Sequence, residues 1–441
     1  MEGADIYPTA ILIVGPLLTL VAIIFSIADV RKKRLLQDTP TSKVQGVFIG
    51  LVELKGNAEA ENPLTSFLAG LRCVHFAWTA EERWTRTVTV TETDKDGHTR
   101  TRTRTETGWE TVASGGKTMP FYLKDDTGVI LVHPEGADIE PASVFDRTCG
   151  PTDPLYYGKG PAGAVNGSDS IRRFTEDAIP LHAPLFVVGR ARERRDVVAP
   201  EIARDPAAPM FIISTRTEEA VTAGFAHWAW GLGLLGLALS AGTVAARHMA
   251  RKEPIADEAE AYVLSGLGYL AAWSLGWVWM LYNSLVGLRE RVREGWSLID
   301  VELKRRHDLI TNLVEVTRAL RDYERTVQTH VAELRGQLAA TPPGEPGPDP
   351  SGCVPVIRAV VERYPELKAD EGFLRLQKSL VETEQRIALA RGYFNEVASF
   401  YNARLEKAPD RFLTGLGGFQ PRALLAAANF ERAQVAVKLS D

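Results

Sequence analysis

The chain has few cysteines and no strong excess of charge of either sign. Its 441 residues include three cysteines, Cys73, Cys149 and Cys353, which are too few for a disulfide-rich scaffold. They are also too few for a RING finger or a zinc ribbon, which needs about four closely spaced Cys or His ligands. A formal net charge of −5 gives no basis for binding nucleic acid through its phosphates. No nucleic-acid partner is therefore predicted.

Three long segments contain no Asp, Glu, Lys or Arg, namely residues 6–28, 221–246 and 262–288. Each is longer than the about 20 apolar residues that cross ~30 Å of hydrocarbon, and three such runs exceed what a soluble core usually holds. The first run is followed, not preceded, by a basic cluster (Arg31, Lys32, Lys33 and Arg34), which is the reverse of a signal peptide. We predict three transmembrane helices in 1–30, 221–246 and 262–288, the first of them an uncleaved anchor.

Small residues inside these runs predict close packing between helices. Residues 231–236 spell the GxGxxG pattern of dinucleotide-binding loops, but the segment has no preceding strand and no suitably spaced acidic partner. We interpret it as helix packing, and no cofactor is predicted. Gly268, Ala272 and Gly276 recur every four residues, which predicts a face for close helix approach.

The basic residues predict the orientation in the membrane. Segments 29–46 and 289–306 contain five and six Lys or Arg residues, and segment 1–8 contains none. The positive-inside rule then places the N-terminus outside and both large domains in the cytoplasm. The predicted location is the bacterial inner (cytoplasmic) membrane, as a multi-pass protein.

The segment between the first two spans, 44–215, is predicted to be rich in β-strands. Threonines alternate along 85–93 and 99–107 around a turn that contains Gly97, which indicates a hairpin. Further strands are predicted at 46–54, 119–123, 129–133 and 185–190. Arg100, Arg102 and Arg104 lie in the hairpin, whose two faces are both polar, so we expect it to project from the domain. It is either a basic arm for lipid headgroups or a partner, or a solvated ribbon.

Short motifs in this segment resemble the GIDE domain, also called BAM ("beside a membrane"). The motifs are 63–66 (PLTS), 73–76 (CVHF), Trp109, 120–123 (PFYL), 125–128 (DDTG), 132–134 (VHP), Ala137, 172–179 with Glu176, and 187–191 (VVGRA). The resemblance implies a β-rich domain close to a membrane. In the membrane E3 ubiquitin ligases that carry this domain, the activity lies in a RING finger, for which this sequence has no ligand set. The resemblance therefore does not imply ubiquitin transfer.

The segment after the third span, 289–441, is predicted to be an antiparallel helical bundle. A heptad pattern predicts that the third span continues to about residue 340 as one helix, on the order of 120 Å long. A proline-rich linker at 341–353 ends it, and further helices are predicted at 354–364 and 371–407.

The C-terminal segment resembles the LemA family over 282–430. The matching motifs are 282–286 (YNSLV), 291–296 (RVREGW), 299–301 (IDV), 303–310 (LKRRHDLI), 312–315 (NLVE), 368–371 (KADE), 393–395 (YFN), 401–402 (YN), Pro409 and 415–419 (GLGGF). Thr311 stands where the family usually has proline, so a straighter helix is expected. The resemblance implies a membrane-anchored helical domain without an established catalytic activity.

Two groups of reactive side chains allow more than one interpretation. A charged belt consisting of Lys304, Arg305, Arg306, His307 and Asp308 could bind an anion or a partner. The structural alternative, which we favour, is an ion-pair network between packed helices, with Glu384 and Arg391 as partners. Cys73 and His75 share one face of a predicted strand, which is more typical of a core than of a nucleophile or a metal site. His307 has no HExxH partner, so no metal site is predicted.

The sequence as a whole predicts a membrane α+β protein with three transmembrane helices. The function that we favour is a non-enzymatic scaffold or adaptor of the bacterial envelope that self-associates and recruits other membrane proteins. One alternative is a lipid or stress sensor that uses the basic hairpin. The other is a hydrolase-like or ligase-like activity in the β domain, for which we find no persuasive pair of nucleophile and base.

Overall fold

The structure is a computed structural model that describes residues 6–93, 99–163, 165–194, 199–206, 208, 210–251, 259–320 and 371–425. The chain forms two compact units. One, the β unit, is Thr41–Val221, and the other, the helical unit, combines Met1–Pro40 with Thr222–Asp441. The linker predicted at 341–353, the helix predicted at 354–364 and the end of the long helix beyond residue 320 lie outside the described residues.

Three long helices contain the three uncharged runs. They are α1 (Ile6–Gln37), α3 (Glu218–Arg251) and α4 (Ala259–Leu320). All three are long and apolar enough to cross a membrane. The 62 residues of α4 correspond to about 93 Å of helix, so this helix continues well beyond its apolar part without a break. The predicted continuity from the third span into the C-terminal domain is confirmed as far as residue 320.

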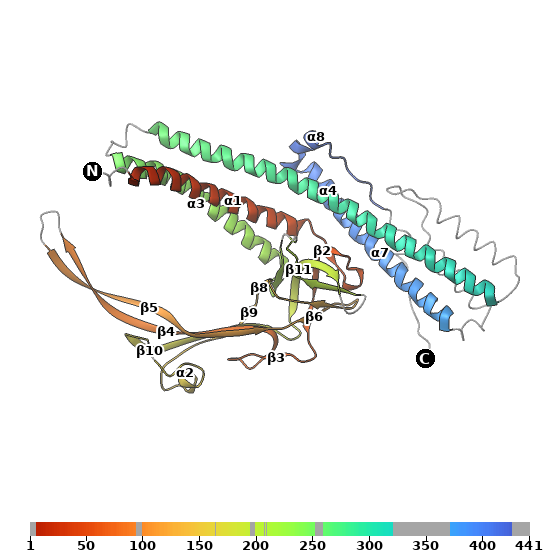
Figure 1. The fold of residues 1–441 in the computed structure, drawn as a ribbon, viewed down its shortest axis with the longest axis horizontal. Helices are drawn as coiled ribbons and strands as arrows, with labels where there is room; N and C mark the ends of the chain where they lie inside the picture. The colour runs from red at the N-terminus through yellow and green to blue at the C-terminus, as the bar shows by residue number, and fades with distance from the viewer. Residues whose placement is uncertain are drawn as a thin grey trace. The chain divides into compact units, whose positions relative to one another are not determined.

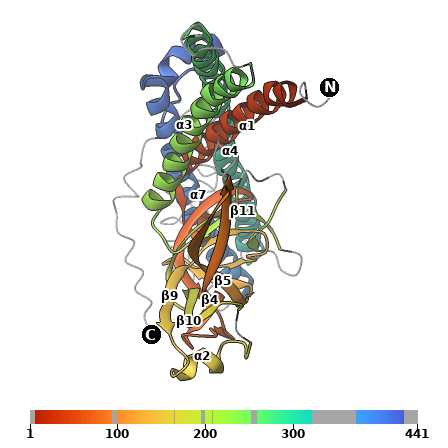
Figure 2. The same cartoon turned by 90° about the vertical axis from the view of Figure 1, so that its left-hand side faces the viewer.

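Helices α1, α3 and α4 pack together, and α3 runs antiparallel to the other two (Figures 1 and 2). The hydroxyl of Ser26 in α1 donates to the carbonyl of Ala229 in α3 at 2.8 Å. Tyr269 of α4 donates to the carbonyl of Gly233 at 2.5 Å, and a Cβ at Gly236 would come within 2.9 Å of the Tyr269 ring. Gly233 and Gly236 therefore serve helix packing, as predicted, whereas a Cβ at Gly231 would meet nothing within 4 Å.

Helix α7 (Glu371–Glu406) packs against the polar half of α4 and runs antiparallel to it. Trp296 of α4 meets Phe394 of α7 with 5.5 Å between ring centroids, and Val397, Ala398 and Tyr401 are fully buried nearby. After α7 the chain forms η4 (Asp410–Leu413) and α8 (Thr414–Gly417). The helix predicted at 371–407 is confirmed. A larger antiparallel bundle remains a prediction, because it depends on 321–370.

The β unit contains a small closed barrel. Its five strands pair in a ring in the order β2 (Gly50–Glu59), β6 (Phe121–Lys124), β7 (Val129–Val132), β12 (Pro200–Ala203) and β11 (Pro184–Glu193), and β11 closes back onto β2. The short strands β1 (Thr41–Ser42), β13 (Ile212–Ser214) and β8 (Asp138–Glu140) extend this sheet. Alternating apolar residues such as Val52, Leu54, Val187 and Ile202 fill the interior.

A second sheet carries the predicted hairpin. It consists of β3 (Leu64–Thr65), β4 (Arg72–Thr93), β5 (Thr99–Thr118), β9 (Ala142–Cys149) and β10 (Ser168–Pro180), and the short helix α2 (Pro154–Gly158) follows β9. The threonine register is as predicted, because Thr85 faces Thr107 and Thr91 faces Thr101. The hairpin is confirmed, and its strands extend further into the body of the sheet than predicted.

The prediction of a strand at 46–54 was only partly right. The segment Val44–Gly46 is a 3-10 turn, η1, and the strand covers Gly50–Glu59 instead. Asp125 and Thr127, in the turn between β6 and β7, accept hydrogen bonds from the backbone N–H groups of Val44 and Gln45. These side chains hold the segment outside the ladder of strand hydrogen bonds.

Candidate functional site

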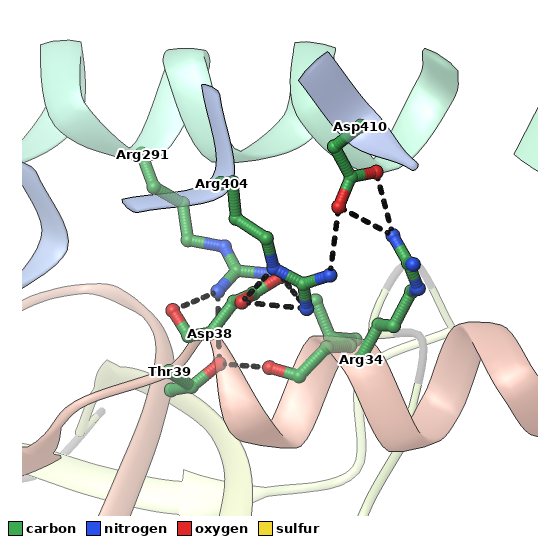
Figure 3. Close-up of polar contacts among 7 residues, drawn as sticks. Arg34, Asp38, Thr39, Arg291, Arg404 and Asp410 are labelled. Atoms are coloured by element: carbon green, nitrogen blue, oxygen red, sulfur yellow. Dashed lines mark hydrogen bonds and ion pairs between the residues drawn. The ribbon is translucent and has the colours of Figure 1, made fainter. Parts of the chain in front are cut away.

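Arginine and aspartate side chains form a cluster where the end of α1 meets α4 and the end of α7 (Figure 3). We call it the Arg–Asp cluster, and its members are Arg34, Asp38, Thr39, Arg291, Arg404 and Asp410. All of them belong to the helical unit. The cluster joins segments that are more than three hundred residues apart in the sequence.

Asp38 is the centre of the cluster. Arg404 donates from Nη2 to both oxygens of its carboxylate, at 2.9 and 3.1 Å, and from Nε to Oδ1 at 3.0 Å. Arg291 donates from Nη1 to the backbone carbonyl of Asp38 and to Oγ1 of Thr39, both at 2.9 Å. The carboxylate and the carbonyl of Asp38 and the hydroxyl of Thr39 thus each accept from a guanidinium group of α4 or α7.

Asp410 provides the second connection. Arg404 donates from Nη1 to its Oδ2 at 3.1 Å, and Arg34 donates from Nη1 to Oδ1 at 2.9 Å and to Oδ2 at 3.2 Å. Arg404 therefore bridges the two carboxylates (Figure 3). Helix α1 is held twice, once through the acid Asp38 and once through the base Arg34.

Both carboxylates are buried, with Asp38 5% and Asp410 2% exposed. Burial raises the pKa of Asp38, and the charges of Arg404, Arg291 and Arg34 offset part of this effect. Burial alone would lower the pKa of Arg404, but its pairing with Asp38 and Asp410 raises it. Removing one member of such a group leaves a buried charge without compensation, which is strongly destabilising.

The chemistry of the Arg–Asp cluster is suited to holding helices together rather than to a reaction. Arginine keeps its proton at any physiological pH, and the carboxylate oxygens already accept from guanidinium groups. The contacts span α1, α4, α7 and η4, so they fix how the C-terminal helices sit on the apolar helices. The arrangement couples the two parts of the helical unit mechanically.

Our reading of the sequence did not identify this cluster. The available signals were Asp38, which closely follows the basic run, and Arg291 and Asp410, which lie in or beside the LemA-like motifs. Spacing along the chain cannot pair residues as distant as Asp38 and Arg404.

Arg306, one of the five residues of the charged belt, forms the ion pair between packed helices that we favoured. Arg306 is 1% exposed, and its Nε lies 3.3 Å from Oε1 of Glu384 on α7, the partner named from the sequence. One turn earlier, Glu302 lies 3.8 Å from Arg386. Lys304, Arg305, His307 and Asp308 are exposed on α4. The structure therefore separates Arg306 from its four neighbours, which do not share its buried ion pair.

The small-residue face is divided between two environments. A Cβ at Gly276 would lie 2.5 Å from Cδ1 of Ile27, so this glycine allows α1 to approach α4 closely. A Cβ at Gly268 would meet nothing within 4 Å, and Ala272 is exposed. Gly268 and Ala272 are therefore open to a contact outside the described part of the chain.

The hairpin projects beyond its neighbouring strand. Strand β4 pairs with β5 along its length, but β10 pairs with β4 only as far as Trp84. From Thr85 onward, β4 and β5 therefore form a two-stranded ribbon (Figure 1). The side chains of Arg100 and Arg102 lie outside the described residues. Arg104 is largely exposed and lies 3.9 Å from Glu106. This geometry agrees with a projecting arm and leaves the arm's ligand open.

Buried polar groups in the β unit are engaged in holding loops. Arg172 of β10 donates to Glu82 of β4 at 2.8 Å and to the carbonyl of Tyr156 at 2.7 Å. Glu176, also on β10, accepts from the backbone N–H groups of residues 67–69 at 2.7–3.1 Å. The GIDE-like residues Arg172 and Glu176 thus fix the loops around the sheet.

The surroundings of Cys73 and His75 do not activate the Cys73 thiol. Cys73 is buried, and burial, with a contribution from the Glu176 carboxylate, raises the pKa of its thiol to about 11. A thiol with such a pKa is a poor nucleophile at neutral pH. Nδ1 of His75 lies 2.6 Å from Oγ1 of Thr118. Within the described ranges, no group of three His, Cys, Asp or Glu residues could hold a metal ion.

The three long apolar helices and the two compact units define the class of the protein. It is a membrane protein with one β unit and one helical unit. The model of the LemA family matches residues 295–439, and a GIDE model, described as "E3 Ubiquitin ligase", matches residues 89–246. The chain therefore contains a GIDE domain and a LemA-family region. The GIDE match begins within β4 and includes most of α3, whereas the β unit begins at Thr41.

The chain is also similar to magnetosome proteins. MamQ 2 and MamQ 1 of Paramagnetospirillum magneticum are each 26% identical to it over 190 residues, which covers 36% of this chain and 67% of the relative. MamQ of Magnetospirillum gryphiswaldense is 25% identical over 173 residues, which covers 32% of this chain and 63% of the relative. The chain thus spans about two thirds of the length of each relative.

Proposed function

We propose that this protein is a non-enzymatic, membrane-anchored scaffold of the bacterial envelope. It holds a β domain (44–215) and a helical domain (289–441) at one membrane surface and recruits other membrane proteins there. The observation that carries the proposal is the Arg–Asp cluster, because a fastening between the first apolar helix and the C-terminal helices makes a rigid base for presenting domains. The similarity to bacterial MamQ proteins and the GIDE and LemA-family regions support it.

The proposed orientation follows from connectivity and charge. Two apolar helices, α3 and α4, separate the β unit from the C-terminal helices, so an even number of crossings returns the chain to the same side. The Lys and Arg residues that follow α1's apolar run and α4's apolar run support the cytoplasmic side for both domains, with the N-terminus outside the inner membrane.

Self-association is the part of the proposal that can be measured first. Light scattering on the detergent-solubilised full chain, corrected for bound detergent, gives the protein mass independently of shape. A discrete multimer of the 48.4 kDa chain is expected. A clean monomer, both in detergent and in lipid nanodiscs, would contradict self-assembly and would leave only a monomeric adaptor.

The projecting hairpin supports a second candidate function, a sensor of anionic lipid. The experiment compares binding of residues 41–221 to vesicles with and without anionic lipid, for the wild type and for Arg100, Arg102 and Arg104 changed to Glu. A matched control reverses three exposed bases elsewhere in the β unit, Lys117, Lys124 and Arg204. Selective loss of binding in the hairpin variant supports the sensor, because each base near a charged surface contributes about 1 kcal/mol. Equal effects of the two variants would contradict it.

A further inference from the structure

The segment after α7 carries two large apolar side chains that nothing in the described structure covers. Phe412 in η4 is 76% exposed and Leu416 in α8 is 82% exposed. Residues on the apolar faces of the three long helices have similar values, for example 72% for Leu275. Phe412 and Leu416 are thus as exposed as side chains of helices that are apolar enough to cross a membrane.

Contacts to the long helices fix the depth of this segment. At its start, Asp410 pairs with Arg34, six residues and about 9 Å beyond the uncharged run of α1. At its end, the ring of Phe419 lies 5.7 Å from the ring of Tyr282, which is inside the uncharged run of α4. The guanidinium of Arg289, the first charge after that run, lies 5.3 Å from the same Phe419 ring. Segment 410–419 therefore lies beside the last turns of the uncharged run of α4 and beside the basic residues that follow the uncharged run of α1.

The backbone of this segment is built to make that turn. Gly418 has φ +59°, a left-handed conformation that most side chains avoid. A Cβ at Gly417 would lie 2.1 Å from Cε2 of Phe419, so a side chain there would push this ring away from α4. The two glycines return the chain to α4 and leave Phe412 and Leu416 on the outside of the turn.

We propose that residues 410–419 form a membrane-dipping turn, in which Phe412 and Leu416 insert among the lipid acyl chains beside the third span. The contact between the buried Phe419 and Tyr282 attaches the end of the turn to the uncharged run of α4. Exposed charges close to the turn are predominantly basic, with Lys407, Arg411 and Arg422 against Glu406, which suits a bilayer that contains anionic headgroups. The turn adds a membrane contact of the helical unit that does not depend on self-association.

The test places an environment-sensitive fluorophore (NBD) at Leu416→Cys in the full chain, reconstituted in vesicles of phosphatidylcholine and phosphatidylglycerol. The background variant carries Cys353→Ser, and its own labelling measures any reaction at the buried Cys73 and Cys149. Phe412→Cys gives a second, independent probe. Leu374→Cys is the matched control, because Leu374 is also an exposed leucine but lies near the start of α7, about 47 Å along the helix from Leu405.

We expect blue-shifted emission at positions 416 and 412, and several-fold stronger quenching by lipids with a nitroxide in the upper acyl chain than at position 374. Aqueous-like emission that iodide quenches, at both positions, would overturn the proposal. Blue-shifted emission without nitroxide quenching would also overturn it, because another protein surface would then cover the turn.

Discussion

At the scale of single residues, Asp38 holds the largest share of the contacts that join α1 to the C-terminal helices. Its carboxylate accepts from Arg404 and its backbone carbonyl accepts from Arg291. The Asp38 carboxylate follows the charged residues at the end of α1, and its negative charge compensates the buried guanidinium of Arg404. Its removal tests the fastening directly.

We predict that Asp38→Asn lowers the free energy of unfolding of the helical unit by about 3 kcal/mol, because Arg404 loses one of its two buried counter-charges. The measurement is thermal unfolding of the detergent-solubilised chain, followed by helical circular dichroism. Glu290→Gln is the matched control, since Glu290 on α4 forms an exposed ion pair with Arg293 at 2.8 Å. Such pairs contribute at most about 1 kcal/mol. Equal midpoints for the two variants would show that the cluster does not fasten α1.

We predict that the stability of the β unit depends on pH through the carboxyl group of Glu53. Burial raises the pKa of this carboxyl from 4.5 to about 7, with a further contribution from Glu218. The folded state therefore keeps a proton that the unfolded state releases. Stability from this group is fully present below pH 4.5 and is lost as the pH rises towards 7, by up to about 3 kcal/mol.

The measurement for Glu53 is the unfolding midpoint of the β unit between pH 4.5 and 8, followed by circular dichroism of the strands. Glu53→Gln is expected to flatten the profile. Thr41 donates a hydrogen bond to the Glu53 carboxylate at 2.6 Å, so Thr41→Val should move the loss of stability to higher pH. An unchanged profile in both variants would mean that Glu53 is ionised in the folded protein across this range.

At the scale of elements, the sequence predicts those whose pattern is local. The long helices and the threonine hairpin follow from runs of uncharged residues and from strict alternation, and both are present. Strand β10 has a less regular pattern, because Arg172 and Glu176 are charged residues at buried positions. Periodicity assigns such residues to the surface, and only their partners in β4 and the 67–69 loop explain their burial.

Elements that depend on distant partners could not be predicted in the same way. Closure of the barrel requires β11 to pair with β2, over a hundred residues earlier in the chain. The Arg–Asp cluster likewise depends on how α7 returns along α4 to reach α1. The resemblance to the LemA family indicated a helical domain but not the residues that attach it to the first span.

At the scale of the whole molecule, the divided small-residue face separates folding from assembly. We predict that Gly268→Leu reduces the mass of the detergent-solubilised particle and leaves its unfolding midpoint nearly unchanged. The reason is that a Cβ at Gly268 would meet nothing within 4 Å among the described residues, so we expect a larger side chain there to obstruct a second copy. Close approach of helices in a membrane requires small residues at their contact.

Gly276→Leu is the matched variant, because the same substitution eight residues further along α4 meets Ile27 of α1 at the position of the first added carbon. It should lower the unfolding midpoint, since overpacking at a tight contact costs about 1–3 kcal/mol. Light scattering and thermal unfolding on both variants give two masses and two unfolding midpoints.

A loss of mass for Gly268→Leu alone assigns self-association to the exposed part of this face. An unchanged mass for Gly268→Leu in a multimeric wild type would exclude this face and would direct the search for the oligomer contact to the exposed residues of α4 beyond the membrane, Lys304 and Arg305 among them.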